Sequence, residues 1–127
     1  MTSKKILIVD DDAFDNSLIE RALRKLSPPC DIVILDDSRL AVVTFATLAP
    51  DLTLLDINMP HVDGFQVLLQ IIEQARMNKK AIVMLSGSTN PLDKERALEI
   101  GASDYRVKPS LLAEYDSLAE ELIRLHT

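Results

Sequence analysis

The stretch that decides the fold runs from residue 52 to residue 64 and reads LTLLDINMPHVDG. It opens with a mostly apolar run that predicts a buried strand, and Asp56 follows that run directly. The next residues, from Asn58 to Gly64, are too rich in Pro, Gly and Asn for regular structure, so we expect a loop there. An acid at the end of a buried strand is well placed for chemistry, because the ligand crevice of an open α/β sheet lies beyond the carboxyl ends of its strands.

Polar or charged side chains also follow the other apolar runs of the chain: Asp10 and Asp11 after residues 6–9, Ser86 after residues 81–85, and Lys108 with Pro109 after the short stretch that starts at Tyr105. Functional side chains at successive strand ends indicate one composite site rather than scattered surface charge. The clustered carboxylates require a divalent cation, because unpaired carboxylates repel one another.

Apolar runs and amphipathic stretches alternate five times along the chain. Buried strands are predicted over residues 5–9, 31–35, 52–55, 81–85 and 104–107. Amphipathic helices are predicted from Asp12, as the helix cap, to a stop at Pro28, and over residues 38–48, 65–77, 90–100 and 111–125. The middle strands are apolar throughout, as is typical of a parallel sheet with helices on both faces. The predicted fold class is α/β, a doubly wound five-stranded parallel sheet in one domain over residues 1–127.

Apolar stripes on the first and last helices predict which faces are buried. The stripe of the first helix consists of Phe14, Leu18, Ala22, Leu23 and Leu26. The stripe of the last helix consists of Leu111, Tyr115, Leu118, Leu122 and Leu125. Leu112, Ala119 and Ile123 widen this second stripe, so part of the last helix also suits a partner or dimer surface.

Composition narrows the function classes. The chain has 127 residues, 47% of them hydrophobic, which allows a full core without a disulfide or a structural metal. Its formal net charge is −6, with no basic cluster and no Trp, which argues against nucleic-acid binding. Cys30 is the only cysteine and is expected to be a buried small residue. No apolar run at the N-terminus is long enough for a signal peptide or a membrane span, so a cytoplasmic location is expected.

Four motifs together resemble the receiver domain of two-component response regulators, and the resemblance covers essentially the whole chain. They are Val9-Asp10-Asp11, Leu55–Pro60 with Asp63-Gly64, Leu85-Ser86-Gly87, and Gly101–Pro109. Each motif alone is a weak signal, whereas all four in order and correctly spaced are a strong one. The resemblance implies the flavodoxin-like strand order 2-1-3-4-5, which places the first and third strands side by side at the crevice.

The resemblance also assigns roles to the residues at the strand ends. Asp56 is implied to be the phosphoacceptor, and Mg²⁺ is the implied cofactor. Its implied ligands are Asp11, Asp56 and the backbone carbonyl of Asn58, with Asp10 acting directly or through water. Lys108 would hold the phosphoryl oxygens, and a cis bond before Pro109 would aim it into the site.

The implied switch consists of two residues. Ser86 would move toward the phosphoryl group, and Tyr105 would then turn inward to fill the space that Ser86 leaves. The surface formed by residues 91–100, 104–107 and 111–125 would change with them. Arg106 and Ser110 depart from the residue types usual in the family, which leaves the identity of the partner open.

The function expected from these features is that of a stand-alone, single-domain response regulator. It would accept a phosphoryl group from a histidine kinase or a phosphotransfer protein and bind a downstream protein, with a homodimer through the switch surface as a further expectation. It would catalyse only its own phosphorylation and dephosphorylation and so is not expected to be an enzyme. A motor-binding regulator, a phosphorelay intermediate and a phosphate sink stay open. The helix start Asp12–Asp15 resembles that of small receivers paired with photoreceptor kinases.

Three rival functions fit the sequence less well. A hydrolase of the haloacid dehalogenase type needs a second acid two residues after its nucleophile, where this chain has Asn58. A flavodoxin-like flavin binder needs a phosphate-binding loop after the first strand, where Asp10–Asp12 would repel a phosphate. A receiver-like module that binds partners without phosphorylation is disfavoured by the intact set of acids, hydroxyl and lysine.

Overall fold

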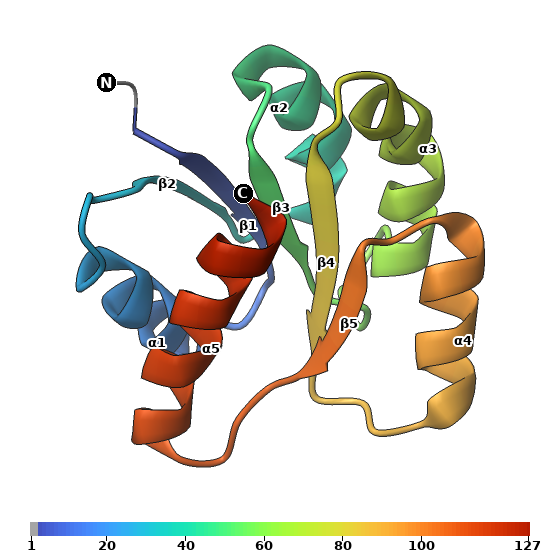
Figure 1. The fold of residues 1–127 in the computed structure, drawn as a ribbon. Coiled ribbons are helices and arrows are strands. Elements are labelled where there is room, and N and C mark those ends of the chain that lie inside the picture. The colour runs from blue at the N-terminus through green and yellow to red at the C-terminus, as the bar shows by residue number, and fades with distance from the viewer. Residues whose placement is uncertain (1–2) are drawn as a thin grey trace.

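The computed structural model describes residues 3–127 and contains one five-stranded parallel sheet (Figure 1). The strands are β1 (Lys5–Val9), β2 (Asp31–Leu35), β3 (Leu52–Leu55), β4 (Ala81–Ser86) and β5 (Asp104–Val107). They are arranged in the order β2-β1-β3-β4-β5, and every neighbouring pair is parallel. The predicted fold class and strand order are therefore confirmed.

Helices cover both faces of this sheet. They are α1 (Ala13–Arg24), α2 (Ala41–Leu48), α3 (Gly64–Met77), α4 (Pro91–Ile100) and α5 (Leu112–His126), with a short 3₁₀ helix, η1 (Ser38–Leu40), before α2. Figure 1 shows α1 and α5 together on one face and α2, α3 and α4 on the other. No helix within residues 3–127 is long and apolar enough to cross a membrane.

The middle strands β1, β3 and β4 are largely apolar because each contributes to two cores. On β1, Leu7 and Val9 pack in the core under α2, α3 and α4, whereas Ile6 and Ile8 pack in the core under α1 and α5. All four side chains are at most 2% exposed. Alternate residues of a strand point to opposite faces, so a sheet covered on both sides needs apolar residues at every position.

Side-chain caps set the starts of the helices near the carboxyl edge of the sheet. The carboxylate of Asp12 accepts a hydrogen bond from the backbone N–H of Asp15 at the start of α1, as predicted. Asp63 forms a capping box with Gln66 at the start of α3. At the other end of α4, Gly101 has φ +126°, a conformation that other residues rarely adopt, and it ends the helix as expected.

The predicted stripes of α1 and α5 are right over most of their length, including Leu26, which packs against the core, and wrong at three positions. Phe14 is 70% exposed, and Leu111 and Leu125 are 64% and 56% exposed. The buried residues of α1 are Asn16, Ile19, Ala22 and Leu23, and at about 3.6 residues per turn Phe14 lies on another side of the helix. Leu111 has extended backbone dihedrals and precedes α5, and Leu125 lies in the last turn of that helix.

The peptide bond before Pro109 is another correction. It was expected to be cis, but the one cis bond within residues 3–127 lies between Ser27 and Pro28. The backbone N–H of Lys108 donates to the carbonyl of Ser86 at 2.8 Å, so the pairing of β5 with β4 continues through Lys108. This hydrogen bond aims the lysine toward the sheet edge without a cis bond.

Candidate functional site

The backbone of the sheet fixes the predicted site residues just beyond the strands that carry them. The N–H of Asp10 donates to the carbonyl of Leu35 on β2, and the N–H of Asp56 donates to that of Val9 on β1. Together with the bond from Lys108 to β4, these contacts extend three strand pairs by one residue each. The functional side chains are therefore held by the sheet itself rather than by mobile loops.

Three carboxylates meet at this edge. Because Val9 and Leu55 are partners in the β1–β3 register, the residues that follow them are neighbours. One carboxylate oxygen from each of Asp10, Asp11 and Asp56 lies within 4.8 Å of the others. Asp10 and Asp56 are buried, while Asp11 is exposed at the mouth of the cluster.

The proximity of these acids changes the pKa of Asp56. Burial, followed by the negative charge of Asp10, raises it to about 6. The charge of Lys108 and hydrogen bonds from the Ile57 backbone and the Ser86 hydroxyl oppose this shift. Because burial and Asp10 disfavour the ionised form of Asp56, an added positive charge nearby would stabilise that form.

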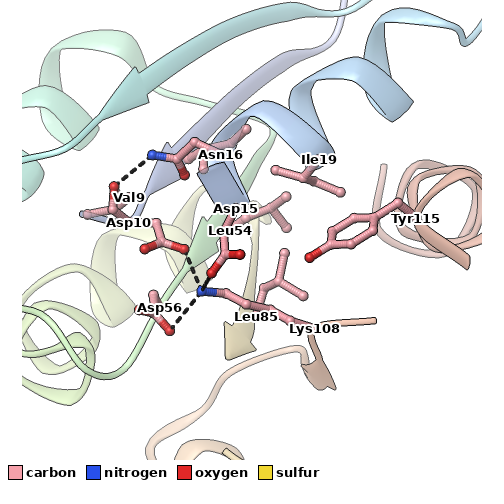
Figure 2. A pocket seen from close by; sticks show the side chains of 11 residues that line it. Val9, Asp10, Asp15, Asn16, Ile19, Leu54, Asp56, Leu85, Lys108 and Tyr115 are labelled. Carbon is pink, nitrogen blue, oxygen red and sulfur yellow. Dashed lines mark hydrogen bonds and ion pairs between the residues drawn. The ribbon is translucent and has the colours of Figure 1, made fainter. Parts of the chain in front are cut away.

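Lys108 lies among the acids, as Figure 2 shows. Its Nζ atom is 2.7 Å from Asp10 Oδ2, 2.8 Å from Asp15 Oδ2 and 3.7 Å from Asp56 Oδ1. Burial lowers the pKa of Lys108, but hydrogen bonds to Asp10 and Asp15 and the charges of Asp10 and Asp56 outweigh it and raise the pKa above its usual value. The ammonium group is therefore firmly protonated at neutral pH.

Asp15 and Asn16 are site residues that the sequence analysis did not identify. Asp15 reaches Lys108 from the first turn of α1, and the Asn16 side chain donates to the carbonyl of Asp10 at 2.8 Å (Figure 2). The available signal was the cap at Asp12, because a helix that starts beside the strand end presents its first turn to the site.

Ser86 and Tyr105 meet at the loop between β4 and α4. The Ser86 hydroxyl is fully buried and accepts from the N–H of Ser88 at 3.3 Å. The Tyr105 hydroxyl donates to the carbonyl of Ser88 at 2.8 Å, and the ring is 5% exposed. Ser88 Oγ also donates to Asp93 of α4 at 2.5 Å. The structure thus holds Tyr105 in its inward position, linked to Ser86 through Ser88.

The loop after β3 brings Asn58 to the same edge. Asn58 is exposed, while Ile57 and Met59 on either side are buried and hold the loop down. Ser38 clamps the loop from η1, because its hydroxyl donates to the carbonyl of Pro60 at 2.9 Å and accepts from the N–H of Val62 at 3.3 Å. Sequence analysis did not identify Ser38 because the contact spans more than twenty residues.

The donor set fits a hard divalent cation. Carboxylate oxygens and backbone carbonyls are the ligands that Mg²⁺ and Mn²⁺ prefer. Asp10 already accepts from the Asp12 N–H through Oδ1 and pairs with Lys108 through Oδ2, whereas Asp11 is open to solvent. Asp11 and Asp56 are therefore the carboxylates best placed to act as direct ligands.

An apolar groove of about 520 Å³ adjoins the acid cluster. It lies between the start of α1 and the loop from β5 to α5, with Lys108 at its inner end. Its apolar lining includes the exposed side chains of Phe14, Leu111 and Leu112. Two of the exposed stripe residues, Phe14 and Leu111, thus border the site.

Known proteins share this sequence and this architecture. The family described as response regulator receiver domain matches residues 6–119. The transcriptional regulatory protein PrrA of Mycobacterium tuberculosis is 35% identical over 98% of this chain, which covers 52% of PrrA. This chain spans about half the length of such curated relatives.

Solved structures match the chain over nearly its whole length. The phosphorylated cyanobacterial phytochrome response regulator RcpA superposes with a TM-score of 0.87 at 29% identity, over 99% of this chain and 97% of RcpA. The Mn²⁺-bound form of the response regulator Rcp1 gives a TM-score of 0.83 at 26% identity, over 96% of this chain and 93% of Rcp1. With the family match, the strand order and the acid cluster, these likenesses show that the chain belongs to the response regulator receiver domain family of two-component signalling.

Proposed function

We propose that this chain accepts a phosphoryl group from the phosphohistidine of a histidine kinase or a phosphotransfer protein onto Asp56. The observation that carries the proposal is the position of Asp56: a buried carboxylate at a strand end, 3.7 Å from the Lys108 ammonium and beside two further acids. A carboxylate oxygen of Asp56 would attack phosphorus as the P–N bond breaks, and the imidazole, protonated on its other ring nitrogen, would leave with the bonding electron pair as a neutral histidine, which gives an acyl phosphate on Asp56.

Charge is the main obstacle to this transfer, since the nucleophile and the donor are both negative. We propose that Mg²⁺ is held by Asp11, Asp56 and the carbonyl of Asn58, with Asp10 acting directly or through water, and that it offsets this repulsion when bound. The Mn²⁺ in the Rcp1 structure supports a divalent cation here. Lys108 would bind a phosphoryl oxygen as a point charge, and the Ser86 hydroxyl would donate to another.

The phosphodonor needs a surface beside Asp56 on which to dock. We propose that it docks on the apolar groove, where Phe14, Leu111 and Leu112 are exposed within reach of the site. RcpA is described as a phytochrome response regulator, which supports a photoreceptor histidine kinase as the donor. The net charge of −6 supports protein rather than nucleic-acid partners.

Output would pass from Ser86 through Tyr105 to the surface of α4, β5 and α5, where a downstream protein or a second copy of the chain would bind. The contacts that join Ser86, Ser88 and Tyr105 support this route. We also propose that the receiver works as a single-domain regulator that catalyses only its own phosphorylation and dephosphorylation. The matches to RcpA and Rcp1 over 97% and 93% of their chains support the single-domain form.

The test is intact-mass measurement after incubation with acetyl phosphate, with and without Mg²⁺. We expect one labile phosphoryl adduct that requires Mg²⁺ and is absent in Asp56→Asn. Asp31→Asn is the matched control, because Asp31 is exposed at the opposite end of β2 and should leave labelling unchanged.

Two results would contradict the proposal. An adduct that persists in Asp56→Asn would place the phosphoryl group elsewhere. No adduct on the wild type, under conditions that label a known receiver, would favour a module that binds partners without phosphorylation.

A further inference from the structure

The Lys108 ammonium has more acid partners than the proposed transfer requires. Asp10 and Asp15 lie at 2.7 and 2.8 Å from Nζ, whereas Asp56, the proposed nucleophile, lies at 3.7 Å. The proposed metal site and phosphoryl site do not use Asp15. It nevertheless makes one of the two shortest contacts of the lysine, so its effect on Lys108 needs an explanation.

The contact between Asp15 and Lys108 is well defined by its surroundings. The side chains are 28% and 13% exposed, so the pair is shielded from water more than an ordinary surface ion pair. The backbone of Asp15 is fixed as well, because its N–H donates to the capping carboxylate of Asp12 at 3.0 Å. An aspartate has a short side chain, so a fixed backbone leaves the carboxylate little freedom.

The geometry of an ammonium group shows what this contact does. Lysine has three N–H donors in a tetrahedral arrangement. Asp10 and Asp15 both lie within hydrogen-bond distance of Nζ and together occupy two of the three donors. Asp56, at 3.7 Å, lies beyond that distance. The third donor has no acid within hydrogen-bond distance, and Asp56 is the next nearest carboxylate.

We propose that Asp15 is a positioning residue that holds Lys108 away from Asp56 before phosphorylation. Without it, the ammonium would move onto Asp56 and pair directly with the carboxylate that has to attack phosphorus. With it, the Asp56 oxygens stay available, and Lys108 keeps its third donor for the incoming group. This inference rests on the proposed function, because it assumes that Asp56 is the nucleophile.

A simpler role for Asp15 predicts different results. If Asp15 acted only through its negative charge, it would repel the phosphodonor, and any neutral residue in its place would speed phosphorylation. The substitution Asp15→Asn removes the charge and keeps an oxygen that can accept from Lys108. The substitution Asp15→Leu removes both the charge and the accepting oxygen and keeps a side chain of similar size. The two variants therefore separate positioning from charge.

The first experiment measures the rate of phosphorylation by phosphoramidate at saturating Mg²⁺. A small donor is used because it needs no docking surface. We expect Asp15→Leu to be about tenfold slower than the wild type, since misplacing a group by about 1 Å can cost up to about 100-fold. Asp15→Asn should stay within about threefold of the wild type, because it retains the contact.

The control for this experiment is Glu20→Leu, which removes a carboxylate from the same helix. Glu20 pairs with Arg24 and does not contact Lys108, so the rate should not change. If both Asp15 variants were phosphorylated as fast as the wild type or faster, the positioning role would be overturned. If Glu20→Leu slowed phosphorylation as much as Asp15→Leu does, the positioning role would also be overturned, because losing any carboxylate from α1 would then have the same effect.

The second experiment observes the lysine directly and does not depend on phosphorylation. In protein labelled with ¹⁵N-lysine, an ammonium group held by two acids should give a distinct, slowly exchanging signal, assigned by its loss in Lys108→Arg. We expect this signal in the wild type and in Asp15→Asn, and its loss in Asp15→Leu. A signal that persists in Asp15→Leu would overturn the inference. If the signal behaves as expected but Asp56 is never phosphorylated, the proposed function fails and the contact stands.

Discussion

Asp56 is the residue with the strongest electrostatic conflict in the site. It is buried beside Asp10, and both effects favour its protonated form, so its pKa lies near 6. The unfolded chain would ionise the same carboxyl near pH 4. Between these two values the folded protein binds the proton more tightly than the unfolded chain does, so stability falls as the pH rises through this window.

Replacing Asp56 by Asn should therefore stabilise the metal-free protein at neutral pH. We expect the free energy of unfolding of Asp56→Asn to exceed that of the wild type by about 1–3 kcal/mol near pH 7, because a neutral amide avoids the repulsion from Asp10. The difference should shrink as the pH falls below about 6 and should vanish only well below about pH 4, where the wild-type carboxyl is protonated in both states. Urea denaturation in EDTA at several pH values measures it, and a difference that is independent of pH would contradict this account.

Gly64 gives a second prediction at this scale. A Cβ atom there would lie 2.0 Å from the carbonyl oxygen of Asp56 and 2.9 Å from Cα of Ile57, both of which belong to the backbone. We expect Gly64→Ala to lower the free energy of unfolding by about 2 kcal/mol or more, since the crowded atoms cannot rotate away. The control is Gly87→Ala, in which the added Cβ meets no atom within 4 Å. Its free energy of unfolding, measured by urea denaturation, should change little.

At the scale of elements, the loop from β3 to α3 depends on a contact from another part of the chain. Ser38 is 4% exposed and bonds both the carbonyl of Pro60 and the N–H of Val62. This loop carries Asn58, whose carbonyl is a proposed metal ligand. The clamp therefore links η1 to the proposed metal site.

We predict that Ser38→Ala weakens binding of Mg²⁺ several-fold and lowers stability by about 1–2 kcal/mol, because two backbone groups lose a buried partner. Titration of Mg²⁺ followed by NMR measures the affinity. Ser103→Ala is the comparison, since Ser103 accepts from the N–H of Ile82 at the opposite edge of the sheet. The affinity of Ser103→Ala for Mg²⁺ should match that of the wild type. If both variants lost the same affinity, Ser38 would act only through the general stability of the fold.

The sequence predicted those parts of the site that the ends of the strands determine. Asp10, Asp11, Asp56 and Lys108 follow apolar runs, and the parallel sheet brings them together. It did not predict the partners that come from helices and loops, such as Asp15 and Ser38. Their contacts depend on how a helix is placed against the sheet, which single-residue periodicity does not encode.

The same limit explains the wrongly predicted helix ends. Periodicity identifies the apolar stripes of α1 and α5, and the middle of each stripe is buried, as at Ala22 and Leu118. Whether a residue of the stripe is buried depends on where the helix begins and which side it turns toward the sheet. Phe14 lies on another side of α1 from the buried residues, Leu111 precedes α5, and Leu125 lies in the last turn of α5.

For the whole molecule, a bound cation would relieve the repulsion that the fold builds into the site. We predict that Mg²⁺ at about 100 times its dissociation constant raises the free energy of unfolding by about 2.7 kcal/mol. Asp11→Asn should abolish this increase and leave the stability in EDTA nearly unchanged, because Asp11 is exposed. Thermal unfolding with Mg²⁺ and with EDTA measures both effects. An undiminished increase in Asp11→Asn would remove that residue from the ligand set.

Lys4 and Thr127 lie close together at the edge of the sheet opposite Asp56. The Lys4 ammonium donates to the backbone oxygen of Thr127 at 3.2 Å, although 123 positions separate them in sequence. A short linker could therefore join the ends, and new termini could be opened in an exposed loop elsewhere to give a circular permutant. For the same reason, a fluorescent reporter fused at either end would lie away from the acid cluster and the apolar groove.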